Sequence, residues 1–191
     1  MVGFKNLIDD KALLENFKNY SKMYGIIFLI LGLFGMLFPV AMSLTTTYFV
    51  AWVFLFAGIS IAVHTYQTNK KDWLGWLKAL IFILATIFTF INPMSGVITL
   101  GIVFATFFLT DALISFTLAY RQRDQRGWWI IALNGLTSLI LSVLFMINWP
   151  FSSIYLVGLY VGISLFFDGI VLLSMSSAVS KLEESKEEVA N

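Results

Sequence analysis

The chain has 191 residues, of which 59% are hydrophobic and 12% are charged, and its mean hydropathy is +0.88. Soluble domains carry about 25% charged residues, so these few polar groups cannot cover such an apolar chain in water, and lipid must be part of its solvent. A formal net charge of +1 provides no basic surface for nucleic acid, and the absence of cysteine excludes disulfides, thiol nucleophiles and thiolate metal sites.

Six apolar runs follow one another along the chain. They cover residues 23–38, 44–66, 74–91, 97–119, 128–147 and 154–176. A helix needs about 17–25 residues to cross a hydrocarbon layer about 30 Å thick, and isolated strands in lipid would leave backbone groups unpaired. The sequence therefore predicts an all-α integral membrane protein. Its six transmembrane helices occupy residues 23–176, between an N-terminal segment at 1–22 and a charged tail at 177–191.

The basic residues predict the orientation of these helices. All 12 Lys and Arg lie before the first run, between runs two and three, between runs four and five, or after the sixth run, except Lys78, which lies just inside run three. The three other connections have none. Because cytoplasmic loops carry an excess of Lys and Arg, we expect both termini to be cytoplasmic, in the plasma membrane of the cell.

An internal repeat accompanies this pattern. Pro39, Pro93 and Pro150 each lie in one of the predicted outside turns, 54 and 57 residues apart. Aligning the chain on these prolines predicts three parallel helical hairpins, over residues 23–66, 74–119 and 128–176.

Small residues recur in the second helix of each predicted hairpin, eight and twelve residues after the proline. Offsets of four residues return to nearly the same helical face, so these residues form a stripe that lets helix backbones approach closely in lipid. The residues of the predicted packing stripe are Thr47, Ala51, Gly101, Ala105, Gly158 and Gly162.

Two carboxylates lie inside the apolar runs. Asp111 and Asp168 both follow their proline by eighteen residues, whereas the first repeat has Ala57 at this position. Within each predicted hairpin, Lys78 reaches a depth similar to that of Asp111, and Asn134 reaches a depth similar to that of Asp168. A charged Asp at the centre of a spanning helix costs about 2.5–3.5 kcal/mol, which a polar partner would partly offset. The alternatives are a structural hydrogen bond or ion pair and a site that handles protons.

Other site chemistry has little support in the sequence. His64 is the single histidine, and no second histidine or carboxylate cluster accompanies it as a metal site would require. We find no Ser/His constellation and no H-E-x-x-H motif, so we expect no catalytic residue, no cofactor and no enzyme activity. The expected partners are the lipid bilayer and a possible second copy of the chain.

The hairpin sequence YGIIFLILGLFGMLFP, its proline turn, and the helices ending in FAGISIA and FFDGIVLL resemble the HdeD family of bacterial membrane proteins. The resemblance covers residues 22–176. It implies a protein of short hydrophobic repeats that protects the cell in acid or another envelope stress. The family has no established catalytic residue, so the resemblance assigns none to this chain. A small transporter or channel, for protons or a small solute, is the alternative function.

Overall fold

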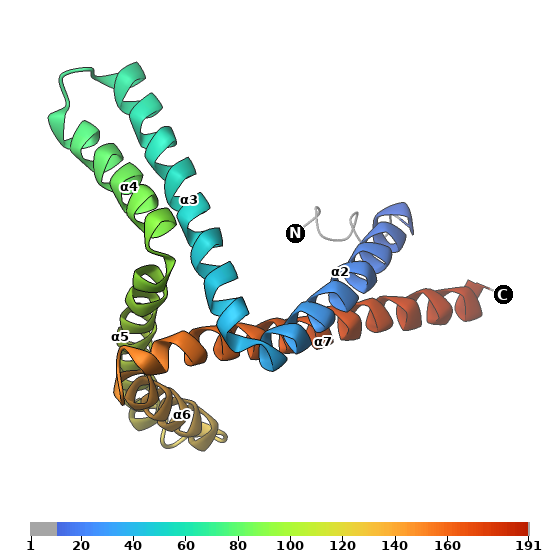
Figure 1. The fold of residues 1–191 in the computed structure, drawn as a ribbon. Helices are drawn as coiled ribbons and strands as arrows, with labels where there is room; N and C mark the ends of the chain where they lie inside the picture. Colours follow the sequence, from blue (N-terminus) through green and yellow to red (C-terminus); the bar gives the residue numbers. More distant parts are fainter. Residues whose placement is uncertain (1–10, 191) are drawn as a thin grey trace. The chain divides into compact units, whose positions relative to one another are not determined.

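The computed structural model describes the backbone of residues 11–190 and the side chains of residues 16–180. Every regular element in this range is an α-helix (Figure 1). The helices are α2 (Lys11–Leu37), α3 (Pro39–Thr68), α4 (Trp73–Ile91), α5 (Pro93–Arg121), α6 (Trp128–Met146) and α7 (Phe151–Ala190). The first ten residues of the predicted N-terminal segment lie outside the described range.

All six helices are long and apolar enough to cross a membrane, so the predicted all-α chain with six spanning helices is confirmed. In the most apolar window of each helix, at most 28% of the residues are buried within the protein. The remaining apolar side chains need a non-aqueous surrounding, and lipid supplies it. Two of the three predicted turn prolines, Pro39 and Pro93, are the first residues of helices, where the missing N–H of proline leaves no hydrogen bond unmade.

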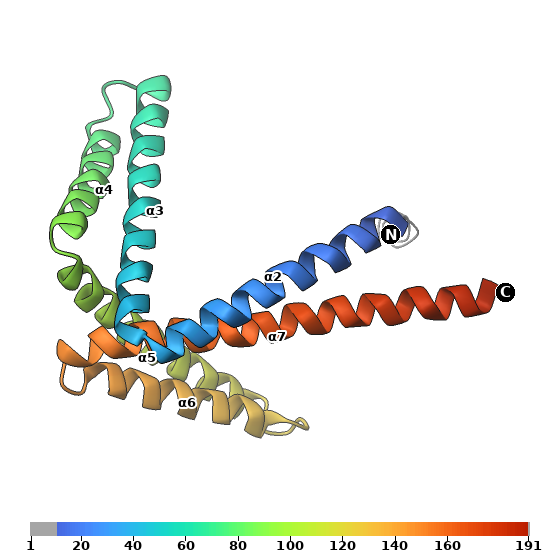
Figure 2. The same ribbon diagram turned by 45° about the vertical axis from the view of Figure 1, so that its right-hand side comes forward.

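The chain divides into two compact units, and each consists of helices in close antiparallel pairs. In the unit Pro39–Leu159, α3 packs along α4 and α5 packs along α6. In the other unit, α2 and the part of α7 from Tyr160 onward lie side by side in both views (Figures 1 and 2). The predicted hairpin over residues 74–119 does not form a close pair, because α4 and α5 make only a small contact with each other.

The lengths of the connections explain the pairing within the unit Pro39–Leu159. Adjacent antiparallel helices are joined by about 2–8 residues. Only Asn92 separates α4 from α5, which is too short for the chain to reverse and bring the two helices side by side. Residues 69–72 and 122–127 separate the helices that do pair, and the second connection ends at Gly127, whose φ of 95° lies in the left-handed region that glycine favours.

The two pairs of this unit share one kind of hydrogen bond between their helices. The hydroxyl of Thr86 on α4 donates a hydrogen bond of 3.3 Å to the carbonyl of Ala51 on α3. The hydroxyl of Ser142 on α6 donates one of 2.9 Å to the carbonyl of Ala105 on α5. Ala51 and Ala105 are the equivalent residues of the first two repeats, twelve positions after their prolines, so each repeat presents the same backbone carbonyl to its partner helix.

In the pair of α2 and α7, the equivalent backbone carbonyl also faces the partner helix. Gly162 is the equivalent of Ala105 in the third repeat. A Cβ atom added at Gly32 of α2 would lie 2.8 Å from the Gly162 carbonyl oxygen, so this carbonyl again faces the partner helix. Here two glycines face each other, so no side chain separates the two backbones at this point.

Candidate functional site: a polar cluster between α5 and α6

The cluster is centred on the carboxylate of Asp111, which is half-buried on α5. Its Oδ2 atom accepts a hydrogen bond of 2.5 Å from the Ser138 hydroxyl and one of 3.2 Å from Nδ2 of Asn134, both on α6. Asn134 Nδ2 also lies 3.0 Å from Oγ of Ser115. Four polar side chains from two helices therefore form one connected network.

The helical repeat and small neighbouring residues bring these side chains together. Asp111 and Ser115 are one turn apart on α5, and Asn134 and Ser138 are one turn apart on α6, so each pair lies on a single face. Between the members of the second pair lies Gly135, where an added Cβ would be only 3.1 Å from Cβ of Ser115. This close approach is what allows short side chains such as serine and asparagine to reach the partner helix.

The hydrogen bonds of the network offset the free-energy cost of placing the Asp111 carboxylate in an apolar helix. An ionised carboxylate strengthens the hydrogen bonds that it accepts, and each such bond contributes about 1.5–3 kcal/mol. Two of them are comparable with the cost of about 2.5–3.5 kcal/mol for placing a charged Asp within a membrane helix. Both bonds end on Oδ2, and no described residue donates to Oδ1. The cluster therefore joins α5 to α6 through a single carboxylate oxygen, Oδ2 of Asp111.

Lys78 does not take part in this cluster. Its side chain is exposed on α4, and no ion pair joins it to Asp111 among the described side chains. The expectation that Lys78 is the partner of Asp111 is therefore wrong. That expectation assumed that α4 and α5 pack side by side across the proline turn. In the structure α5 packs along α6, and Asp111 accepts a hydrogen bond from Asn134 on that helix.

Asp168, the second intramembrane carboxylate, has a different environment. It is exposed on α7, and no hydrogen bond to its carboxylate is found among the described residues. Its neighbour Gly169 lies in the contact with α2, where an added Cβ would be 2.8 Å from the Gly25 carbonyl oxygen. Asn134, the expected partner of Asp168, instead donates to Asp111.

The structure buries every residue of the predicted packing stripe. Two glycines of the stripe contact the backbone of other helices directly. At Gly158, an added Cβ would overlap the carbonyl oxygen of Pro39, and at Gly162 it would lie 2.7 Å from the carbonyl carbon of Gly35. The amide of Gly158 also donates a hydrogen bond of 2.6 Å to the hydroxyl of Ser43. The small side chains thus lie at places where helices meet.

Sequence reasoning missed Ser115 and Ser138, which are both buried within the cluster. Serine is common in membrane helices because its hydroxyl can bond to a carbonyl of its own helix, so a serine alone predicts no site. The usable signal is the spacing, since each serine follows a polar residue of the cluster by four positions.

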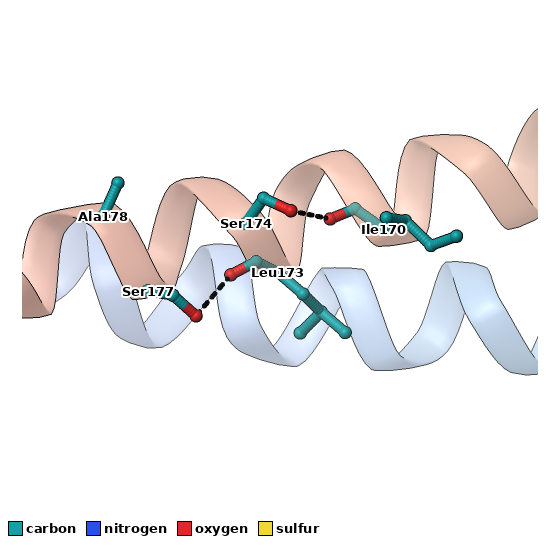
Figure 3. Close-up of a pocket in the computed structure, with 5 residues that line it drawn as sticks. All are labelled: Ile170, Leu173, Ser174, Ser177 and Ala178. Atoms are coloured by element: carbon teal, nitrogen blue, oxygen red, sulfur yellow. Dashed lines mark hydrogen bonds between the residues drawn. The ribbon is translucent and has the colours of Figure 1, made fainter.

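A hollow of about 450 Å³ on α7 shows the more usual role of helix serines (Figure 3). The hydroxyl of Ser174 donates to the Ile170 carbonyl at 2.8 Å, and that of Ser177 donates to the Leu173 carbonyl at 3.0 Å. Both protons are used within the helix, so neither is directed at a ligand. Among the described residues, no three His, Asp or Glu side chains gather as a metal site would require.

Known proteins similar to this chain span nearly all of it. Residues 23–87 and 77–147 match a family described as a short repeat of unknown function (DUF308). Protein HdeD of Escherichia coli K12 is 24% identical over 176 residues, which cover 90% of this chain and 93% of that protein. The HdeD proteins of Escherichia coli O157:H7 and Shigella flexneri match to the same extent. No solved structure matches the chain.

Proposed function

This chain belongs to the DUF308 short-repeat family, and from that premise we propose that it is an HdeD-type protein that protects the cell in acid or another envelope stress without catalysing a reaction. The observation that supports this most is the extent of the similarity to HdeD, which covers 90% of the chain and therefore includes its repeats rather than one span. The protein acts in the plasma membrane, with both termini in the cytoplasm.

Within this function, the role of Asp111 is to hold α5 against α6. Its two hydrogen bonds cross the helix pair, and the residues that donate them have no other evident reason to lie opposite a carboxylate. Loss of these bonds would weaken the pair in a medium where water cannot replace them.

The experiment compares a strain that lacks the gene with strains that carry the wild-type chain or a variant. We expect deletion to reduce the surviving colony count after acid challenge and to let cytoplasmic pH fall further, and the wild-type gene to restore both. Asp111→Asn should lower the folded yield and protection together. Asp168→Asn is the matched control, because this carboxylate is exposed and lacks the cluster, and it should leave both unchanged. Equal survival with and without the gene would refute a protective role.

A small transporter or channel for protons is the second candidate, and Oδ1 of Asp111, to which no described residue donates a hydrogen bond, favours it. An asparagine cannot titrate, so this function requires that Asp111→Asn folds normally but loses protection. It also requires that the purified wild-type chain, reconstituted in vesicles, accelerates proton entry down an imposed pH gradient. Normal folding and full protection in the Asp111→Asn strain would exclude proton chemistry at this residue.

A further inference from the structure

A groove of about 340 Å³ lies at the start of α4, outside the polar cluster. Its walls combine two lysines, two tryptophans and two leucines. They are Lys70, Lys71, Trp73, Trp76, Leu77 and Leu80. The lysines come from the connection between α3 and α4, whereas the leucines lie in the first turns of the spanning helix.

The lysine-bearing connection has a defined conformation. The indole Nε1 of Trp76 donates a hydrogen bond of 3.2 Å to the backbone carbonyl of Lys70. The amide of Lys71 donates one of 3.1 Å to the side-chain oxygen of Asn69, and the amide of Asp72 donates one of 3.0 Å to the Asn69 carbonyl. The turn therefore presents its two lysines at one fixed end of the groove.

The charge at this end favours an anion. Lys70 Nζ lies 4.2 Å from the centre of the Tyr66 ring, and neither lysine of the groove forms an ion pair with another described residue. The opposing carboxylate, Asp72, is turned toward Gly75, where its Oδ2 would be 2.9 Å from an added Cβ. The side chain of Asp72 makes no capping hydrogen bond at the start of α4, and the two lysines outnumber this one carboxylate at this end of the groove.

The other end of the groove is apolar and belongs to the spanning part of α4. Leu77 is 37% exposed and Leu80 is 51% exposed, and Trp73, which also lines the groove, is 68% exposed. A free phosphate ion would contact only the lysine end. A ligand that uses the whole groove needs an anionic head and an apolar chain that enters the bilayer.

We propose that this groove binds an anionic phospholipid, with its phosphate at Lys70 and Lys71 and an acyl chain along Leu77 and Leu80. Tryptophans are enriched at membrane interfaces, and basic residues near the membrane surface attract anionic headgroups. The geometry assigns the site to one position on α4 rather than to the general surface of the helices. This binding is independent of any role in acid survival.

The test uses the full chain purified in a neutral detergent and titrated with dioleoylphosphatidylglycerol, with dioleoylphosphatidylcholine or with inorganic phosphate. The readouts are the thermal unfolding midpoint and the lipid concentration that gives half of its shift. We expect phosphatidylglycerol to raise the midpoint at the lowest concentration. Lys71→Gln should raise the half-saturating concentration about fivefold, and the Lys70→Gln/Lys71→Gln double variant about thirtyfold, as expected for two basic residues at the membrane surface.

Lys22→Gln is the control, because it removes the same charge from an exposed position on α2. It should leave the half-saturating concentration of phosphatidylglycerol unchanged. The proposal is overturned if Lys71→Gln has no effect, if Lys22→Gln has the same effect, or if phosphatidylcholine or phosphate stabilises the chain as well as phosphatidylglycerol does. Should the double variant fail to fold, the single Lys71→Gln variant decides, since no described residue forms a hydrogen bond or ion pair with the side chain of Lys71.

Discussion

Replacing glycine by alanine usually stabilises a helix, but at Gly158 we expect it to lower the free energy of unfolding. The added Cβ would overlap the Pro39 carbonyl oxygen and lie 2.7 Å from both the Pro39 carbonyl carbon and the Ser43 amide nitrogen. All three are backbone atoms, which cannot turn aside as a flexible side chain can. The first turns of α7 and α3 must therefore separate, and the hydrogen bond from the Gly158 amide to the Ser43 hydroxyl lengthens or breaks.

The expected magnitude follows from three contributions. Alanine in place of glycine stabilises a helix interior by about 1 kcal/mol. Forcing a methyl group into a packed interface costs about 1–3 kcal/mol, and a hydrogen bond between membrane helices contributes about 0.6 kcal/mol. The Gly158→Ala variant should thus have an unfolding free energy about 0.6–2.6 kcal/mol lower than that of the wild type.

The assay is reversible unfolding of the full chain in mixed micelles with increasing SDS, followed by circular dichroism. Val103→Ala is the matched control, because Val103 is 52% exposed on α5 and its truncation opens no packed contact. We expect its unfolding free energy to stay within about 0.5 kcal/mol of the wild type. A Gly158→Ala variant that is more stable than the wild type by about 1 kcal/mol would show that helix propensity acts alone and that the helices do not meet at this glycine.

Two further predictions concern the cluster and the orientation of the chain. In a double-mutant cycle, Asp111→Asn and Ser138→Ala should couple by about 1 kcal/mol in unfolding free energy, whereas Asp111→Asn and Lys78→Met should be additive; the opposite result would restore Lys78 as the partner. A cysteine at the exposed Met94 should react with an impermeant thiol reagent in intact cells and one at Asp124 should not, and reversed labelling would refute cytoplasmic termini.

The positions of the spanning helices could be predicted because they depend on local properties of the chain. Twenty or so apolar residues in succession leave the backbone no alternative to a helix in lipid, whatever its neighbours are. The small residues are predictable for a similar reason, since Gly and Ala four positions apart permit close approach on any partner. Local pattern does not specify which helix that partner is, because lipid and another helix are equally apolar surroundings.

The pairing error has its origin in the prolines. A proline between two apolar runs is compatible with a turn, but it is equally compatible with the first position of the next helix, and Pro93 occupies that position. The depth estimate for the partner of Asp111 then placed Lys78 and Asn134 at one level of the membrane without distinguishing between them. The depth of a residue gives only its position along the membrane normal. Which helix packs beside it depends on which connection is long enough for the chain to reverse direction.

The pairing of α2 with α7 has a consequence for the order in which the protein can be completed. During synthesis, α2 enters the membrane before α3 to α7, but the residues that cover its glycines, such as Phe166 and Gly169, lie on α7, which is made after the other described helices. Until then α2 lacks its close partner, while α3 and α4, and then α5 and α6, can pair as soon as the second member of each pair emerges. A circular permutant that begins at Pro39 and carries α2 behind α7 would make all three pairs sequential neighbours. Such a chain should insert without an interval in which α2 lacks α7.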